Sequence, residues 1–155
     1  MYTLQYERVI QAPPDVVWAV ISDVERYAEY APNLSKAVKT SDSTTPTRTC
    51  WDTDGRSWNE ACVMWEEGEG YAYLVDTTPG DYPYPVTQLK GTWTMQPRQD
   101  GVLVTMRFDM TFKYPVPIAW LLFRLGARGF YKTIAELMDN WEAEMLKRAR
   151  LRRAA

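Results

Sequence analysis

The chain has 155 residues, enough for one domain with a sizeable core, and its 46% hydrophobic and 25% charged residues are typical of a globular protein. It contains no histidine, which excludes the usual metal ligands and the Ser-His and Cys-His nucleophile pairs. Residues 1–146 carry 13 basic and 20 acidic groups, a balance that does not suit a phosphate backbone. We therefore expect no metal, no cofactor and no nucleic-acid partner.

Five cations follow in the short tail from about residue 147. We expect this tail to be a solvated, frayed helix end that complements the helix dipole, with contact to a membrane surface as the less favoured alternative. The start of the chain alternates instead of forming the apolar run of a signal peptide, and no apolar segment approaches the roughly 20 residues that cross a bilayer. Cys50 and Cys62 are too few for a disulfide scaffold. These features predict a cytoplasmic protein with reduced thiols.

The first 30 or so residues predict a strand followed by two short helices. Polar and apolar side chains alternate over residues 2–10, which indicates the strand. Apolar residues at helical spacing then predict one helix from Asp15 and a second, capped by Ser22 or Asp23, that ends before Pro32.

The middle of the chain has the texture of an antiparallel sheet. Residues 34–96 contain short β-like segments separated by turn residues, and Asp54-Gly55 between two of them indicates a tight hairpin. Residues 101–112 form the clearest strand, because one face is entirely apolar and the other is mostly polar. Consecutive strands joined by short turns predict an antiparallel meander.

The last long segment, Ile118 to Ala149, repeats large apolar side chains at spacings of three and four and predicts one amphipathic helix. An unbroken helix of this length would reach roughly 48 Å, longer than the core of a small domain. It is the only element able to cover the concave face of the predicted sheet. The expected class is therefore α+β, one domain over residues 1–155 in which a curved antiparallel sheet of about six to seven strands wraps a long C-terminal helix.

Three features of the sequence leave alternatives open. Gly126 and Gly129 either let the long helix bend away from a ligand or allow it to pack closely on the sheet. The apolar cluster at 118–123 either completes the core, which is favoured, or flanks a portal or packs on a second subunit. The Pro-rich loop that carries Tyr82 and Tyr84 is either a lid over a cavity mouth or an ordinary surface crossover.

One strand carries a mixture of side chains that suits a binding pocket. Trp58, Glu60 and Cys62 alternate along it and therefore share a face. A large ring, a carboxylate and a soft apolar group match a pocket with few placed polar groups, while the plainer alternative makes Trp58 core and Glu60 a wet edge residue. If Glu60 is buried without a cation, its pKa should rise and it could act as an acid or base.

The whole pattern resembles the START/Bet v-like superfamily of helix-grip proteins, also called SRPBCC, and within it the polyketide cyclase/dehydrase and lipid-transport group. The resemblance is carried by APPDVVWAVISDVERYAEYAPNL at 12–34, GTWTMQP at 91–97, GVLVTMRFDMTF at 101–112 and the long final helix. It implies a deep cavity for a hydrophobic molecule between sheet and helix. Because this fold hosts enzymes, carriers and chaperones, it leaves the function open.

The aromatase/cyclase branch of this group typically has a Trp, a small polar residue and an Arg at alternate positions of one strand. Trp58 matches, whereas Glu60 and Cys62 stand where the polar residue and the Arg would be, so the cation that would orient an enolate is missing. Met106 stands near the position of a His that some members use. Tyr27 and Tyr30 match tyrosines that supply hydroxyls at the cavity end in some relatives.

The resulting hypothesis is a protein that binds a hydrophobic, polyketide-like or ring-bearing small molecule between sheet and helix and acts as a polyketide cyclase/dehydratase. In that case Glu60 and Tyr27 are the expected acid/base groups. The alternative is a non-catalytic lipid or quinone carrier, and either form is expected to be a monomer or homodimer. The expected ligand-binding residues are Trp58, Cys62, Tyr30, Tyr73, Trp93, Met106, Phe108, Phe130 and Ile134.

Overall fold

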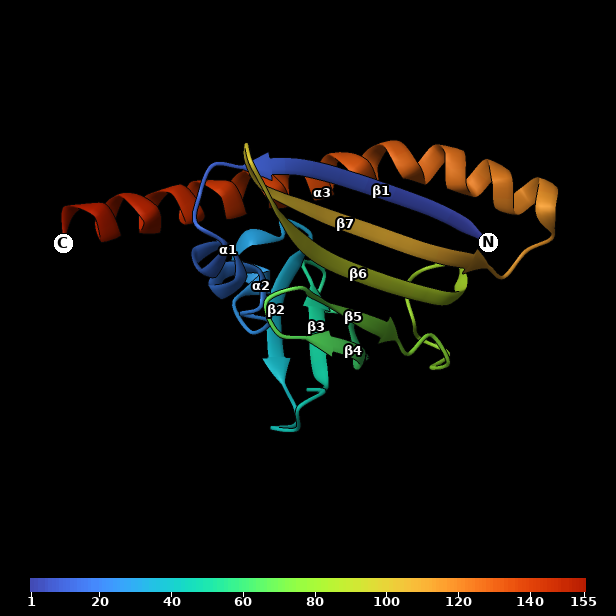
Figure 1. The fold of residues 1–155 in the computed structure, drawn as a ribbon. Helices are drawn as coiled ribbons and strands as arrows, with labels where there is room; N and C mark the ends of the chain where they lie inside the picture. Colours follow the sequence, from blue (N-terminus) through green and yellow to red (C-terminus); the bar gives the residue numbers. More distant parts are fainter.

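The computed structural model describes residues 1–155 and contains one seven-stranded antiparallel sheet. The strand order is β1-β7-β6-β5-β4-β3-β2, so β2 to β7 form a meander and β1 pairs with β7 at the far edge (Figure 1). The strands are β1 (Tyr2–Ile10), β2 (Leu34–Lys39), β3 (Arg48–Asp52), β4 (Ser57–Glu66), β5 (Gly70–Val75), β6 (Val86–Arg98) and β7 (Gly101–Phe112). Each predicted strand is confirmed.

Three helices accompany the sheet: α1 (Pro14–Ile21), α2 (Tyr27–Tyr30) and α3 (Val116–Ala154). The long α3 runs along the sheet beside β1, and its C-terminal end passes α1 (Figure 1). The predicted helix-grip architecture is therefore confirmed. No helix combines the length and the apolar character that crossing a membrane requires.

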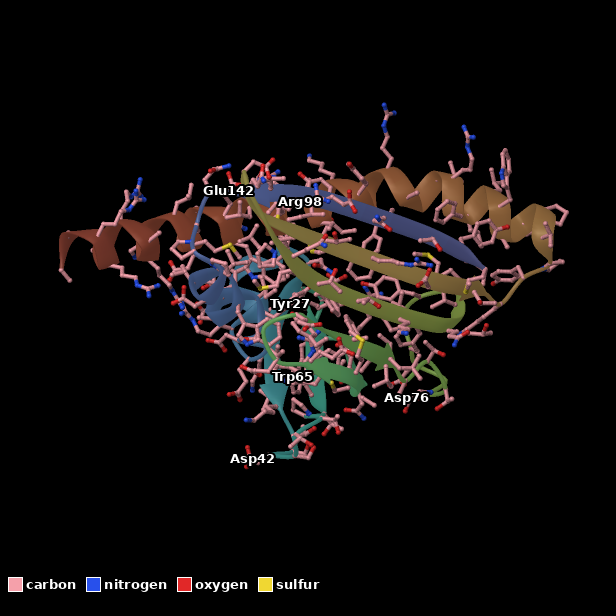
Figure 2. The ribbon with its side chains drawn as sticks, viewed as in Figure 1. Tyr27, Asp42, Trp65, Asp76, Arg98 and Glu142 are labelled. Carbon is pink, nitrogen blue, oxygen red and sulfur yellow. The ribbon has the colours of Figure 1, made fainter.

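The second short helix differs from its prediction. It is a single turn with Arg26 at its N-cap, and Ser22 instead ends α1. Asp23 does not cap α2, which begins at Tyr27; its carboxylate instead accepts a long hydrogen bond of 3.4 Å from the backbone N–H of Arg26 in the preceding turn. The side chain of Tyr27, the first residue of α2, lies near the middle of the molecule, whereas Asp42 marks the tip of the β2–β3 connection (Figure 2).

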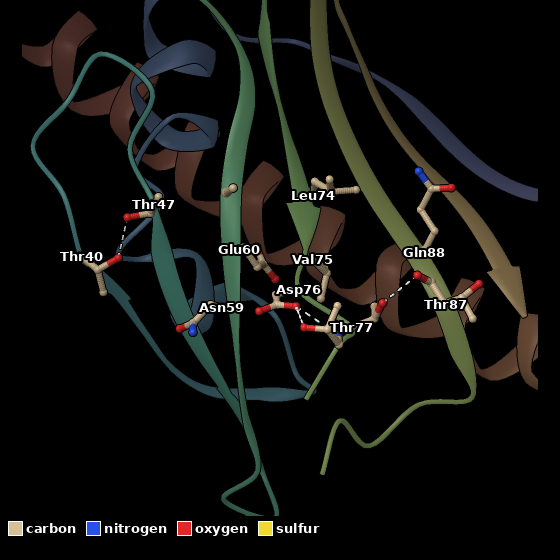
Figure 3. Close-up of a pocket in the computed structure, with 12 residues that line it drawn as sticks. Thr40, Thr47, Asn59, Glu60, Leu74, Val75, Asp76, Thr77, Thr87 and Gln88 are labelled. Carbon is tan, nitrogen blue, oxygen red and sulfur yellow. Dashed lines mark hydrogen bonds between the residues drawn. The ribbon is translucent and has the colours of Figure 1, made fainter. Parts of the chain in front are cut away.

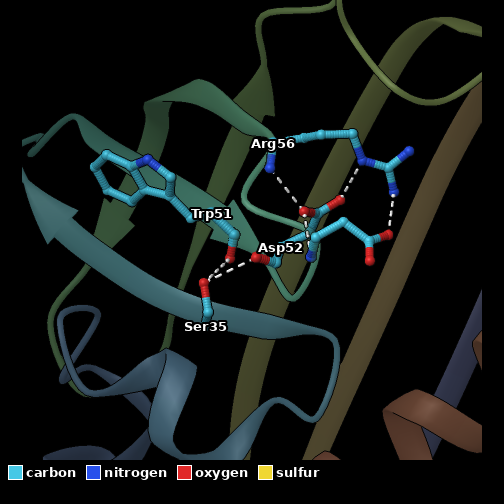
Figure 4. Close-up of polar contacts among 5 residues, drawn as sticks. Ser35, Trp51, Asp52 and Arg56 are labelled. Atoms are coloured by element: carbon cyan, nitrogen blue, oxygen red, sulfur yellow. Dashed lines mark hydrogen bonds and ion pairs between the residues drawn. The ribbon is translucent and has the colours of Figure 1, made fainter.

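The Asp54-Gly55 turn joins β3 to β4 as predicted, and Gly55 has the positive φ of 81° that favours glycine. The Asp52 carboxylate accepts hydrogen bonds from the backbone N–H of Arg56 at 2.9 Å and from its Nε at 2.7 Å. The Ser35 hydroxyl of β2 donates to the Asp52 carbonyl at 2.8 Å (Figure 4). Burial alone would raise the pKa of Asp52, but the Arg56 contacts hold it below its usual value. These bonds fix the hairpin against β2.

The two halves of α3 differ in burial. In the C-terminal half (residues 134–154), Ile134, Leu137, Met138, Trp141, Met145 and Ala149 are buried in the core. In the N-terminal half (residues 116–133), Ala119 is the one buried residue. The expectation that the cluster at 118–123 completes the core is wrong for Ile118, Trp120 and Leu121, each about half exposed. A helix of 39 residues, about 58 Å long, extends further than the core it covers.

The two glycines of α3 do not serve close packing. The helix is continuous through Gly126 and Gly129, and a Cβ placed on either would meet nothing within 4 Å. The C-terminal tail is helical to Ala154, and the Arg152 guanidinium is 2.5 Å from the Asp15 carboxylate of α1. The expectation of a frayed helix end is therefore wrong, because α3 continues through the tail and an ion pair ties it to α1.

Candidate active site

A buried cation on β3 is the main feature that the sequence did not predict. Arg48, Cys50 and Asp52 alternate along β3 and all face inward, and Arg48 is 1% exposed. The register of β3 and β4 places Arg48 opposite Glu60. The Arg48 Nε donates to Glu60 Oε2 at 2.8 Å, and Nη2 is 2.7 Å from the same oxygen. The cation that the β4 sequence lacks therefore comes from the neighbouring strand.

Both oxygens of the Glu60 carboxylate are engaged. While Arg48 holds Oε2, the Trp58 indole N–H donates to Oε1 at 2.8 Å, because residues two apart on a strand share a face. Glu60 is 8% exposed, so the alternative of a wet edge residue is wrong. The expectation for Glu60 as an acid or base assumed burial without a cation, and Arg48 supplies that cation. Cys62 continues this face, is buried, and donates its thiol to the Met64 carbonyl.

Aromatic rings surround the Arg48 guanidinium. Its central carbon lies 4.2 Å from the ring centre of Tyr73, 4.7 Å from Tyr27 and 5.8 Å from Trp93. These contacts, with Glu60, stabilise a cation that burial would otherwise destabilise. Burial is the largest single effect and lowers the pKa of Arg48, but the charges of Glu60, Cys50 and the nearby tyrosines together outweigh it, so the pKa is raised. Burial raises the pKa of Tyr27 and Tyr73, with Arg48 opposing it, so both phenols stay protonated.

The cluster continues through aromatic contacts to α3. The Trp93 ring centre lies 5.6 Å from Tyr27 and 5.5 Å from Phe108, and Phe108 lies 4.9 Å from Phe130 of α3. The position of the Trp93 ring requires glycine at residue 91, because a Cβ there would collide with the indole. The indole therefore lies across a position that must be glycine.

The structure thus brings together most of the residues that the sequence predicted. Met106 and Ile134 are also buried in the same core. Tyr30 lies apart: its ring is beneath Arg26, and the Asn140 amide of α3 donates to its carbonyl at 2.8 Å. Its hydroxyl is buried without a hydrogen-bond partner.

Three polar atoms near Arg48 and Trp58 have no hydrogen-bond partner in the protein. They are the hydroxyls of Tyr73 and Tyr82 and the indole nitrogen of Trp93, all buried. Buried polar groups are nearly always hydrogen-bonded, so these three are suited to meet polar atoms of a bound molecule. Each sits on an aromatic ring, which provides apolar surface next to the polar atom.

The Pro-rich loop covers one end of this cluster. The ring centres of Tyr82 and Tyr84 lie 6.2 Å and 5.9 Å from that of Trp58. Tyr82 is 7% exposed, so the loop packs on the site and does not simply cross the surface. This is the position that a lid would have, with Tyr84 on its more exposed side.

Two main hollows open onto the protein surface. The larger, about 910 Å³, lies at the end of β5 and is lined mainly by polar residues, among them Thr40, Thr77, Thr87, Asp76 and Asn59 (Figure 3). Glu60 also lines it, so this hollow reaches the buried ion pair. The smaller, about 550 Å³, lies where Gln11 to Pro14 meet the end of α3. Neither lies between the sheet and the N-terminal half of α3, where Trp93, Phe108 and Phe130 pack together.

A curved antiparallel sheet that holds a long C-terminal helix, with a polar cluster buried between them, defines a helix-grip protein of the START/Bet v-like class. The chain belongs to the polyketide cyclase/dehydrase and lipid transport family, whose model matches residues 1–145. This membership supports a role in binding a hydrophobic small molecule.

Solved structures share the fold at low sequence identity. The di-domain ARO/CYC StfQ from the steffimycin biosynthetic pathway is 16% identical with a TM-score of 0.79, over 95% of this chain and 51% of StfQ, so this chain spans about half of that protein. The Zhui aromatase/cyclase from Streptomyces sp. R1128 is 14% identical with a TM-score of 0.75, over 95% and 94%. TTHA0849 from Thermus thermophilus is 18% identical with a TM-score of 0.73, over 96% and 99%. No curated protein matches the chain by sequence.

Proposed function

We propose that the protein binds a ring-bearing, polyketide-like molecule in its interior and promotes its cyclisation or dehydration, with Arg48 as the group that recognises a carbonyl oxygen. The observation that carries this proposal is the Arg48–Glu60 ion pair inside a shell of aromatic rings. Burying a charged pair gives little net stability, so a binding or catalytic role accounts for it better than a structural one. Family membership and the likeness to two aromatase/cyclases support the same substrate class.

Each residue of the cluster has a distinct part in the proposed reaction. A water molecule takes the α-proton of the substrate, and the Arg48 guanidinium stabilises the enolate oxygen on which negative charge develops. The Tyr27 hydroxyl, kept protonated by its raised pKa, donates its proton to the carbonyl oxygen as the enolate carbon attacks that carbonyl, and it regains a proton from the same water. Glu60 was expected to be the acid or base, but with both oxygens engaged its proposed role is to position Arg48.

The aromatic walls supply the remaining catalytic effect. A flexible poly-ketone has many conformations, and rings such as Tyr73 and Trp93 favour the folded one in which the reacting carbons are close. The unpartnered Tyr73 hydroxyl and Trp93 indole N–H provide hydrogen bonds to further carbonyl oxygens. Molecules enter either by opening of the Tyr82–Tyr84 loop or through the hollow that reaches Glu60.

A second candidate function is that of a non-catalytic lipid or quinone carrier. The observation that favours it is the exposed apolar surface on the N-terminal half of α3, which an enzyme with a water-soluble substrate does not need. The two candidates differ at Tyr27. A carrier should bind equally well after Tyr27→Phe, whereas a cyclase should lose turnover by more than it loses binding.

The first test is native mass spectrometry of the purified protein, followed by titration with 1,8-dihydroxyanthraquinone as a ring-bearing probe. We expect the probe to quench tryptophan fluorescence, because Trp93 and Trp58 lie in the cluster. Tyr73→Phe should weaken probe binding about fivefold to tenfold, since it removes one hydrogen bond of about 1 kcal/mol. It should not lower stability, because the hydroxyl has no partner in the protein.

Tyr71→Phe is the matched control, because Tyr71 is equally buried but its hydroxyl donates to the Ile21 carbonyl at 2.6 Å. It should lower stability by about 1 kcal/mol and leave probe affinity unchanged. If Tyr73→Phe behaves like Tyr71→Phe, or if no aromatic probe quenches the fluorescence, the proposed binding site is wrong.

A further inference from the structure

The N-terminal half of α3 exposes an apolar stripe to solvent. Ile118, Leu121 and Leu125 are spaced by three and four residues, so they lie on one face of the helix, and they are 48%, 50% and 71% exposed. Val116 and Trp120, on other sides of the same helical segment, are 75% and 51% exposed. The opposite face packs on the sheet, where Phe123 stacks on Tyr2 of β1 at 4.9 Å. Because this part of the helix already packs its opposite face on the sheet, the exposed stripe is not part of the core.

The charges of this region all have the same sign. Residues 113–135 contain Lys113, Arg124, Arg128 and Lys132 and no acidic residue, whereas the rest of the chain has 14 basic and 20 acidic residues. All four cations are exposed, and none forms an ion pair. The basic residues of the C-terminal half behave differently, since Arg148 and Arg152 are paired with carboxylates.

Apolar side chains flanked by unpaired cations fit the surface of an anionic membrane. A helix of this kind lies flat, with its apolar residues at the boundary between headgroups and acyl chains and its cations near the phosphates. Trp120, whose ring lies 5.1 Å from the Arg124 guanidinium, is a residue type that prefers this boundary. Gly126 and Gly129 have open space around them and add no side chain to the surface of the helix.

A second copy of the chain fits the same surface less well. A two-fold dimer places the same patch of each subunit against the other, so Arg124, Arg128 and Lys132 would face the same three cations with no acidic residue between them. Such like-charge contacts oppose association. Anionic lipid removes this repulsion and supplies the missing negative charge.

We propose that the patch formed by Ile118, Leu121, Leu125, Arg124, Arg128 and Lys132, here called the α3 patch, docks the protein on an anionic lipid bilayer. The helix rests on the membrane and does not cross it. Docking depends on the exposed face of α3, while ligand binding depends on the interior cluster around Arg48, so the two properties can be separated by mutation.

The test is co-sedimentation of the full chain with vesicles of phosphatidylcholine, with and without about 30% phosphatidylglycerol, at low and high salt. We expect binding to the anionic vesicles alone and its loss at high salt. The double variant Arg124→Glu/Arg128→Glu should lower the partition coefficient by about tenfold or more, because each cation near an anionic surface contributes about 1 kcal/mol. Leu125→Gln should lower it about threefold to tenfold.

The matched controls lie in the basic tail. Leu151 is 62% exposed and Arg150 is exposed and unpaired, so Leu151→Gln and Arg150→Glu make the same changes outside the α3 patch and should leave vesicle binding nearly unchanged. Far-UV circular dichroism verifies that each variant is folded. If the double variant is not folded, vesicle binding by Leu125→Gln alone tests the proposal. Quenching of Trp120 by brominated lipid, abolished in Trp120→Phe, reports insertion directly.

Three results would overturn the proposal. The first is an absence of binding to anionic vesicles at millimolar lipid. The second is a loss of binding in the tail variants but not in Arg124→Glu/Arg128→Glu, which would assign the contact to the tail. The third is a dimer in analytical ultracentrifugation that Leu125→Gln dissociates, which would make a second copy the partner. Probe binding in the interior should stay unchanged in every α3 patch variant, which separates this test from that of the proposed function.

Discussion

The two halves of α3 have similar apolar periodicity but opposite environments. In the C-terminal half, Trp141 is 1% exposed and its ring lies 5.8 Å from that of Tyr27, so α2 and the sheet enclose it. In the N-terminal half, Leu125 is 71% exposed although it belongs to an equally regular stripe. The C-terminal half anchors the core and the interior cluster, whereas the N-terminal half packs partly buried rings such as Phe130 on them and leaves its other face in water. The difference shows that an apolar stripe on a helix indicates a surface to be covered, but not what covers it.

The largest expected contrast between the halves is in stability. Trp141→Ala should lower the free energy of unfolding by about 3–5 kcal/mol, because it leaves a large cavity in the core. Leu125→Ala should change it by less than about 0.5 kcal/mol, since the side chain is mostly in water. Urea unfolding followed by circular dichroism measures both, and similar values for the two variants would remove the distinction between the halves.

Variants of Arg48 and Glu60 test whether the interior cluster belongs to the core that the C-terminal half of α3 anchors. Glu60→Gln should lower the free energy of unfolding by about 3 kcal/mol, because it leaves the Arg48 guanidinium buried without a countercharge. Hydrogen exchange in the N-terminal half of α3 should not change, because no residue of that half contacts the pair. The double variant Arg48→Met/Glu60→Leu should regain most of the loss, since it removes both charges together.

Alkaline pH should lower the stability of the core that the C-terminal half of α3 anchors, over a defined pH range. Burial raises the pKa of Cys50 to about 12 and also raises those of Tyr27, Tyr71 and Tyr73. These groups ionise first in the unfolded chain, at about pH 9 for the thiol and about pH 10 for the phenols, so the unfolded state binds fewer protons above those values.

The free energy of unfolding should therefore be constant below about pH 8 and fall above about pH 9, by about 1.4 kcal/mol per pH unit for each group ionised only in the unfolded state. Urea titrations between neutral and alkaline pH measure this slope. Cys50→Ala should remove the part of the fall that begins near pH 9. A free energy of unfolding that rises with pH in this range would contradict the burial of these groups.

The smallest effect concerns the exposed half. Gly126→Ala and Gly129→Ala should each increase local helix stability by about 0.5–1 kcal/mol, because alanine favours the helix and nothing lies within 4 Å of the added Cβ. Amide hydrogen exchange in residues 116–133 should slow in both variants while the free energy of global unfolding changes little. Faster exchange would indicate that a kink at these glycines is the preferred state in solution.

Some residues of the site can be predicted from the pattern of a single strand, whereas others depend on how two strands pair. The shared face of Trp58, Glu60 and Cys62 follows from the two-residue period of one strand, and the sequence predicted it correctly. Arg48 was missed because its role depends on the pairing of β3 with β4. A signal was present, since Arg48 and Cys50 alternate with outward residues in the same way, but a charged residue at such a position normally indicates the solvent face.

The sequence alone determined the order of strands and helices, because this order follows from apolar periodicity and turn residues along the chain. The resemblance of its motifs to a known group indicated the helix-grip class and the family. The tertiary structure decided which cation meets Glu60, which tyrosine hydroxyls have no partner, and which half of α3 is buried. Each of these depends on contacts between residues far apart in the chain. Such contacts are set by strand register and by the limited length of the sheet under α3, and no local pattern contains either quantity.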